Sequence, residues 1–191
     1  MSRQFWEESL FWATADGATI TNTATETIVF PNITIPANYM QDGRALKLFA
    51  AGRYAATGSA TVIFALRWGG VAGTMIAQSA AIVTTGTIGS ANAATGAPWD
   101  LDLVVQTRSN GSAGTVFGMG AVTIYNGIAP TMGTVANYGV RASMNSTGLI
   151  TPLVATVDLT ADTALSLTCK WSAGSTSNAT IGHLYTGKSL N

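Results

Sequence analysis

Residue types that commonly perform catalysis are rare in this 191-residue chain, which contains a single histidine, His183, and a single cysteine, Cys169. His183 alternates with Ile181 and Tyr185 along an expected strand, which favours a surface or structurally bonded histidine over a general base. Cys169 lies in the alternating apolar run Leu165–Trp171, where a small buried side chain is the ordinary outcome. One histidine and one cysteine cannot complete the common zinc-ligand sets without several carboxylates. We therefore expect no metal site and no catalytic centre.

Two carboxylates have a spacing that could support acid–base chemistry or calcium binding. Asp100 and Asp102 are two residues apart on an expected strand, which places both side chains on one face. The alternating residues Leu101 and Leu103 belong to the opposite, apolar face. Acidic residues that alternate with leucine in this way are typical of the solvent side of a half-buried strand. The pair is therefore interpreted as surface residues rather than as a site.

Glycine motifs that bind nucleotides are incomplete. Gly118-Met119-Gly120 lacks the third glycine of a dinucleotide fingerprint, and no helix is expected to follow it. Gly187-Lys188-Ser189 resembles part of a phosphate-binding loop but also lacks a following helix. The sequence contains no Gly-x-Ser-x-Gly nucleophile motif. These observations predict a protein with no cofactor and no enzymatic activity.

The charge of the chain is low and balanced. Only 9% of the residues are charged, with 9 basic and 9 acidic side chains, whereas about a quarter is typical of soluble domains. Arg53, Arg67 and Arg108 occupy outward positions of three expected strands. We interpret them as partners of Asp100 and Asp102 rather than as a nucleic-acid surface. With so little charge to keep copies apart, the chain is expected to form a homo-oligomer, with a trimer favoured, and to bind no nucleic acid.

Membrane insertion and export are not expected. The longest uninterrupted apolar stretch near the middle of the chain, Val62–Leu66, is far shorter than the roughly 20 residues that a membrane-spanning helix needs. Ala13-Thr14-Ala15 imitates a signal-peptidase site. However, Glu7 and Glu8 interrupt the apolar region that would have to precede such a site.

Alternating apolar and polar residues dominate the chain and predict β-strands. Two such runs, Leu46–Tyr54 and Val62–Trp68, are separated by a glycine-containing turn signal and are predicted to form a hairpin. A second hairpin is predicted from Trp99–Val105 to Val116–Tyr125, because Asn110-Gly111 lies between them. Further strands are expected at Thr27–Ile35, where Pro31 suggests an edge or a bulge, and at Met75–Val83, Leu153–Leu159, Ala164–Ser172 and Thr180–Leu184.

About eight or nine strands joined by short turn segments predict an all-β fold, an antiparallel two-sheet sandwich. A jelly roll is favoured over an immunoglobulin-type arrangement because the chain lacks paired cysteines, and a barrel is the next possibility. The region Ile128–Pro152 is expected to be the longest irregular segment and to carry contacts. Residues 16–191 are predicted to form the sandwich domain, and residues 1–15 a short N-terminal aromatic arm.

The arm concentrates apolar side chains before the strand pattern begins: Phe5, Trp6, Leu10, Phe11 and Trp12. These residues include two of the five tryptophans of the chain. One interpretation is a short amphipathic helix or first strand that packs on its own domain. The other is an arm that docks into a groove on another subunit through aromatic contacts. We take these five residues as the candidate partner-binding site.

Three stretches, together with Trp171-Ser172 and the closing Ser189-Leu190-Asn191, resemble minor structural proteins of tailed double-stranded DNA bacteriophages: Leu46–Arg53, Phe64–Gly70 and Val157–Thr168. The resemblance extends over most of the chain from about Asp16. It implies a jelly-roll domain of the kind found in capsid decoration or cement proteins, head fibres and tail-tip proteins. It further implies a trimeric, non-enzymatic virion component, made in the host cytoplasm, that binds the major capsid protein or another virion protein. It assigns no functional residues.

Three functions follow as expectations. The first is a capsid decoration or cement protein that binds the capsid shell and stabilises it. The second is a receptor-binding or carbohydrate-binding module at a tail or fibre tip, which would use exposed aromatic residues as sugar platforms. The third, an enzyme such as a glycan hydrolase or lyase on a β-sandwich, is disfavoured because convergent acids and bases are absent from the sequence.

Overall fold

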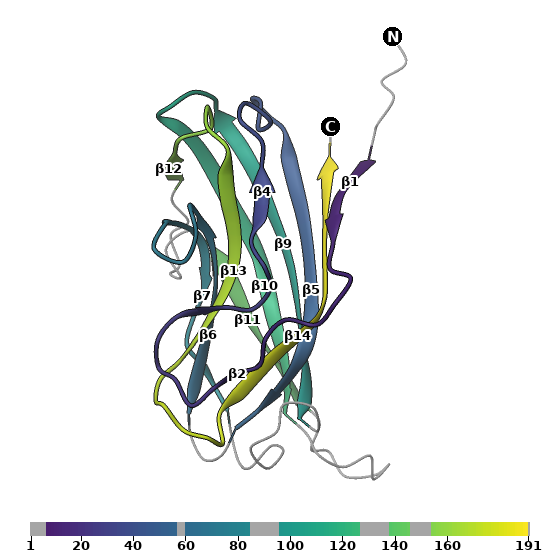
Figure 1. Cartoon of the computed structure of the whole chain (residues 1–191), viewed down its shortest axis with the longest axis vertical. Coiled ribbons are helices and arrows are strands. Elements are labelled where there is room, and N and C mark those ends of the chain that lie inside the picture. The colour runs from purple at the N-terminus through teal and green to yellow at the C-terminus, as the bar shows by residue number, and fades with distance from the viewer. Residues whose placement is uncertain (1–6, 57–59, 85–95, 127–137, 146–153, 191) are drawn as a thin grey trace.

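The computed structural model describes residues 7–56, 60–84, 96–126, 138–145 and 154–190. These residues form one antiparallel sheet of fourteen strands (Figure 1). None of the described residues is helical. The predicted all-β, antiparallel architecture is confirmed at this level.

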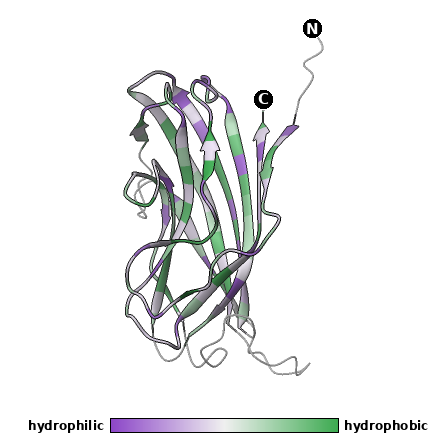
Figure 2. Ribbon diagram, in the orientation of Figure 1, coloured by the Kyte–Doolittle hydropathy of each residue, from purple (hydrophilic) through white to green (hydrophobic). Residues whose placement is uncertain are grey.

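The strands follow one another along the chain with these bounds: β1 Glu7–Trp12, β2 Ile20–Thr21, β3 Thr27–Ile28, β4 Ile33–Ile35, β5 Ala45–Ala55, β6 Thr61–Trp68, β7 Thr74–Ser79, β8 Ile82–Val83, β9 Ala97–Ser109, β10 Gly114–Asn126, β11 Tyr138–Asn145, β12 Ala155–Val157, β13 Thr163–Trp171 and β14 Ala179–Leu190. Hydrophobic and hydrophilic residues are interleaved along the longer strands (Figure 2).

The sheet curls over on itself. Its hydrogen-bonded order is β1-β14-β5-β9-β10-β11-β7-β6-β13-β3. Phe64 on β6 nevertheless packs against Trp99 on β9, with ring centroids 4.8 Å apart, although three strands separate β6 and β9 in that order. The core therefore lies between a back layer, formed by β1, β14, β5, β9, β10 and β11, and a front layer, formed by β7, β6, β13, β3 and β4 (Figure 1).

The alternation in β5 and β9 explains why these strands form the centre of the back layer. Leu46, Leu48 and Ala50 of β5 are fully buried, while Lys47 and Phe49 between them are exposed. The same period of two in β9 buries the apolar side chains and leaves the others outside. Each strand thus has one face against the core and one face toward solvent.

One predicted hairpin is correct and the other is wrong. β9 and β10 pair across the Asn110-Gly111 turn, as predicted. β5 and β6, in contrast, are not partners, because β5 pairs with β14 and β9, whereas β6 pairs with β7, β8 and β13. The chain crosses from the back layer to the front layer between them. Alternation alone does not distinguish a hairpin within one layer from a crossing between layers, since in both arrangements each strand turns one face toward the same core.

Residues 13–35 connect the β14 edge of the back layer to the β13 edge of the front layer. β2 pairs with β14, and β3 and β4 pair with β13. The predicted strand Thr27–Ile35 is therefore divided into two short strands on either side of Pro31, which cannot donate a backbone hydrogen bond. The single strand expected here is thus wrong, whereas the edge position suggested by Pro31 is correct, since β3 lies at the end of the strand order.

A strand also occurs where none was expected. Tyr138–Asn145 forms β11, which pairs with β10 and, through Met144 and Asn145, with β7. It lies within the segment Ile128–Pro152 that we expected to be irregular, so that prediction is wrong for these eight residues. The remainder of that segment lies outside the described residues.

Candidate binding surfaces

The predicted arm enters the structure as an edge strand. β1 pairs with β14 from Glu7 opposite Leu190 to Trp12 opposite Thr186, with an irregularity at Leu10. Phe5 and Trp6 lie outside the described residues. The division into an arm at residues 1–15 and a domain at residues 16–191 stays a prediction, although β1 is hydrogen-bonded to the sheet.

The three described aromatic and apolar residues of the arm have different environments. Leu10 and Phe11 are partly buried and pack against the core. The Phe11 ring meets Tyr185 edge-on, with centroids 4.9 Å apart. It lies over Gly187, where a Cβ atom would come within 2.1 Å of the ring, so only glycine leaves room for it. Trp12, in contrast, is 64% exposed. Of these three, only Trp12 offers most of its side chain to a partner.

Trp12 borders a groove of about 270 Å³ between the start of the chain and the β3–β4 region, lined by Phe11, Trp12, Ala13, Thr14, Ala15, Asp16, Phe30, Pro31, Asn32, Ile33 and Tyr185. The Tyr185 ring packs between Phe11 and Phe30, and its centroid lies 4.9 Å from each of theirs. Burial raises the pKa of Tyr185 well above its usual range. The groove is therefore mainly aromatic and apolar.

Polar groups lie beside the groove. Asp16 Oδ1 is 2.9 Å from Nδ1 of His183. His183 sits at a register shift between Gly182 and Leu184, where the β14 strand bulges away from β5. The bulge leaves His183 exposed, whereas Tyr185 two residues later is buried, so the two do not share a face as the sequence suggested. His183, the only histidine of the chain, is therefore a surface residue in contact with Asp16, in agreement with the structural interpretation of its sequence position.

The outer side of the back layer forms a second candidate surface. Three rows of side chains cross β14, β5, β9 and β10 in register: Lys188, Lys47, Val104 and Met119; Thr186, Phe49, Asp102 and Ala121; and Leu184, Ala51, Asp100 and Thr123. We call these residues, together with Glu7, Arg53 and Tyr125 at their margins, the back face. The alternating burial of β5 and β9 places it on the side away from the core.

The two aspartates predicted to share a face do so, but they do not converge on one site. Asp102 is 3.7 Å from Lys47, and both groups are about half exposed. Asp100 instead accepts a hydrogen bond of 3.2 Å from the Tyr125 hydroxyl, and its charge raises the pKa of Tyr125. The surface interpretation of the pair fits this geometry better than an acid–base pair does.

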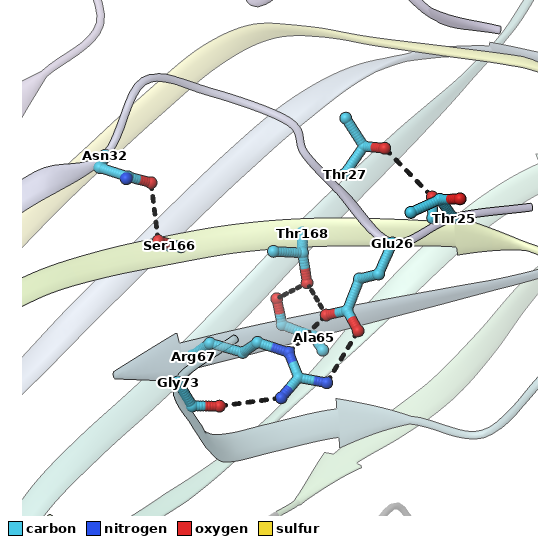
Figure 3. A network of polar contacts seen from close by, with 9 residues as sticks. All are labelled: Thr25, Glu26, Thr27, Asn32, Ala65, Arg67, Gly73, Ser166 and Thr168. Carbon is cyan, nitrogen blue, oxygen red and sulfur yellow. Dashed lines mark hydrogen bonds and ion pairs between the residues drawn. The ribbon is translucent and has the colours of Figure 1, made fainter. Parts of the chain in front are cut away.

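The outer side of the front layer carries the most connected ion pair (Figure 3). Arg67 on β6 donates from Nε and Nη2 to the two carboxylate oxygens of Glu26, at 2.5 and 2.7 Å, and from Nη1 to the Gly73 carbonyl at 2.9 Å. Thr168 on β13 also donates to Glu26. The sequence prediction that Arg67 pairs with an aspartate of the Asp100–Asp102 strand is therefore wrong, because Glu26 approaches from the crossing segment.

Glu26 is held in its charged form. Partial burial acts to raise its pKa, but the hydrogen bonds from Arg67 and Thr168 and the charge of Arg67 prevail and hold the pKa below its ordinary value of 4.5. A carboxylate with a lowered pKa is poorly suited to act as a general acid. The network instead fastens the crossing segment onto the front layer, as does the 2.7 Å hydrogen bond from Ser166 to Asn32 (Figure 3).

The cysteine and the glycine motifs singled out in the sequence lie in the core or within strands. Cys169 is completely buried, and desolvation raises the pKa of its thiol to about 12, so the thiolate nucleophile is suppressed. Gly118 and Gly120 lie within β10, and Gly187 lies within β14. In the described part of the chain, no three His, Cys, Asp or Glu side chains gather as metal ligands would. The same residues contain no helix that could span a bilayer.

No family model matches the chain, and no curated protein matches it.

Proposed function

We propose that this chain is a non-enzymatic structural protein of a virion, which binds the capsid shell as a decoration or cement protein and stabilises it. The observation that carries the proposal is Trp12, the most exposed large hydrophobic residue of the described chain, beside an aromatic groove. Exposed tryptophans that border a preformed pocket are typical of protein interfaces rather than of reaction centres.

The strand order supports a jelly-roll fold for this proposal. The strands fall into two sets of four hydrogen-bonded neighbours, β1/β2-β14-β5-β9 and β3/β4-β13-β6-β7. Along the chain, β10, β11 and β12 are inserted between the sixth and seventh members, β9 and β13. Successive members alternate between the two sets, except that β6 and β7 are neighbours in one set, in the manner of paired Greek keys. Jelly rolls of this kind are common in viral capsid and lectin domains. The fold argument therefore favours a virion role without selecting the surface that the protein binds.

The environment of β1 supports attachment through Trp12. Leu10 and Phe11 pack on the core, and β1 is hydrogen-bonded to β14, so the backbone that carries Trp12 is already ordered. A partner that covers Trp12 consequently does not have to order this strand, which lowers the entropic cost of binding. Phe5 and Trp6, the other two proposed contacts, precede the described residues.

The test measures attachment of the purified chain to virions assembled without it. We expect Trp12→Ala to weaken attachment by about 30-fold or more, the change that defines a hot-spot residue. Val154→Ala serves as the matched control, because Val154 is 50% exposed but lies far from β1 in the strand order. Equal attachment by the Trp12 variant and the parent protein would contradict the proposed site, and no attachment by the parent would contradict the proposed function.

One observation favours a second function, the receptor-binding or carbohydrate-binding module. Trp12 lies near two polar residues, Asp16 and Asn32, and all three line the same groove. One oxygen of each is already bonded, Asp16 Oδ1 to His183 and Asn32 Oδ1 to Ser166. Sugar rings stack on tryptophan while their hydroxyl groups bond to such polar neighbours. A glycan array probed with the purified chain separates the two functions, since selective glycan binding that is lost in Trp12→Ala would support the module.

A further inference from the structure

We propose that the back face binds a second copy of this chain, and that it is the surface through which the protein self-associates. The inference deepens the proposed structural role, because it names a partner, but it concerns a different surface from the Trp12 groove.

The described segments cover one outer side of the sheet and leave side chains exposed on the other. On the front layer, the segment that contains Glu26 and Asn32 crosses the outward side of β6 and β13 (Figure 3). Outward polar groups there, Ser166 and Thr168, are consequently buried. On the back layer, no described segment covers the rows of outward side chains, and large apolar groups remain exposed on them.

The exposed apolar residues of the described chain concentrate on this face. Ten large hydrophobic side chains are exposed among the described residues, and five of them belong to the back face: Phe49, Val104, Met119, Tyr125 and Leu184. They alternate with small neighbours such as Ala51, Ala121 and Thr186, which allow another sheet to approach closely. Exposed apolar side chains that gather on one face mark it as a candidate interaction surface.

The charges of the face suit an identical partner. Its acidic residues, Glu7, Asp100 and Asp102, equal its basic residues, Lys47, Arg53 and Lys188, in number. Two ion pairs, Lys188 with Glu7 at 2.8 Å and Lys47 with Asp102 at 3.7 Å, neutralise most of them within one copy. Arg108 on β9 and Arg141 on β11, both exposed, adjoin these rows on the same outer side. Because most charges within the rows are paired in one copy, the face repels its own copy only weakly.

The relief of the face also suits a second copy. A depression of about 230 Å³ lies between the two ion pairs, lined by Glu7, Lys47, Phe49, Asp102, Thr186 and Lys188. Met119, which is 56% exposed, projects two strands away from β5 on the same face. A contact between identical faces would seat Met119 of each copy in or near the depression of the other, as an isologous interface requires.

The face is large enough for a stable contact. From Ala45 to Arg53, β5 spans about 26 Å, and the distance from β1 to β10 across four strand spacings is about 19 Å. The plane between these limits has an area of about 500 Å², and projecting side chains increase the accessible area toward the roughly 800 Å² per partner of a standard interface. A contact between two identical back faces gives a dimer. The predicted trimer instead needs two different parts of the face in contact, the part over β14 in one copy and the part over β10 in the next.

The test compares matched glutamate substitutions by analytical ultracentrifugation of the purified full chain. Val104→Glu and Met119→Glu each place a charge on the back face, and Val83→Glu places one on β8, where Val83 is 48% exposed. We expect the parent to sediment as a multiple of 19.6 kDa. The dissociation constant should rise by about 30-fold or more in the two back-face variants and stay unchanged in Val83→Glu. Circular dichroism of each variant confirms that it is folded.

A measurement on the parent protein alone tests the inference even if the variants fail to fold. Oxidation of Met119 by hydrogen peroxide should slow as the protein concentration rises through the association range, with free methionine in the same solution as the reference. A monomeric parent, a back-face variant that assembles normally, or Met119 oxidation independent of concentration would each overturn the inference. Virion attachment is measured separately, so the proposed function can fail while self-association stands, and the reverse.

Discussion

At the scale of single residues, the most informative side chain is Glu26. The sequence offers no reason to pair it with Arg67, which is 41 residues away. The structure shows a two-pronged ion pair in which each side chain is only about one-fifth exposed. Replacing one partner of such a pair costs more stability than replacing one partner of an exposed pair, because the charge that remains is poorly solvated.

We expect Glu26→Gln to lower the free energy of unfolding at pH 7 by about 1 to 3 kcal/mol, the range for a hydrogen bond to a charged group. Glu26 has a lowered pKa in the folded state, so its contribution is complete above the unfolded pKa near 4.5 and disappears as the pH falls through the folded value. The difference between parent and variant should therefore shrink between pH 6 and pH 3. Urea unfolding across this range measures it.

Glu7→Gln provides the comparison for Glu26. Its ion pair with Lys188 is about half exposed, so its loss should cost under about 1 kcal/mol. If the two variants lose equal stability, or if the Glu26 effect persists unchanged at pH 3, the crossing segment is not fastened by this pair.

At the scale of elements, β1 places two neighbouring aromatic residues in opposite environments. Phe11 packs on Tyr185, and Trp12 is largely in solvent. The sequence alone left open whether the aromatic segment packs on its own domain or on a partner. The strand geometry allows both, because successive side chains point to opposite sides.

We expect Phe11→Ala to lower the free energy of unfolding by about 2 kcal/mol, in proportion to the apolar area that it loses. For a domain of this size, that change corresponds to a fall in melting temperature of roughly 4 to 8 °C. Trp12→Ala should leave the melting temperature within about 1 to 2 °C of the parent, since an exposed side chain contributes little to stability. Thermal unfolding followed by circular dichroism compares the two. A larger loss in the Trp12 variant would reverse the assignment of the two residues.

The elements also show what alternation can predict. Period-two patterns located β5, β6, β9, β10 and β13, because burial on one face dictates the pattern directly. They did not predict that β5 and β6 belong to different layers, since a hairpin and a crossing bury the same residues. Gly52 gives a further example: a Cβ atom there would lie 2.0 Å from the Ile181 carbonyl oxygen and 2.9 Å from the Trp99 ring. The first contact depends on the register of β14 on β5 and the second on the register of β9 on β5, and no local pattern predicts either register.

At the scale of the whole molecule, composition predicts a partner, which stays a prediction, but it does not predict which surface that partner would contact. The low, balanced charge suggested self-association, while the identification of a particular face required the register of four strands. Phe49, for example, is 55 positions from Val104 and 135 positions from Leu184, so no short window of the sequence contains these exposed apolar residues together. The same limit applies to the Trp12 groove, which joins residues from both ends of the chain.

The balance of charge on the back face leads to a final prediction about the assembled molecule. Since its ion pairs are already formed within each copy, association should depend on apolar burial rather than on attraction between copies. We expect the dissociation constant to change by less than about threefold between 0.05 and 0.5 M NaCl, because salt screens only interactions between charges. Sedimentation at both salt concentrations measures it. A dissociation constant that rises tenfold or more with salt would mean that Lys47, Lys188 and their acidic neighbours exchange partners between copies, so that charge rather than the apolar rows holds the assembly together.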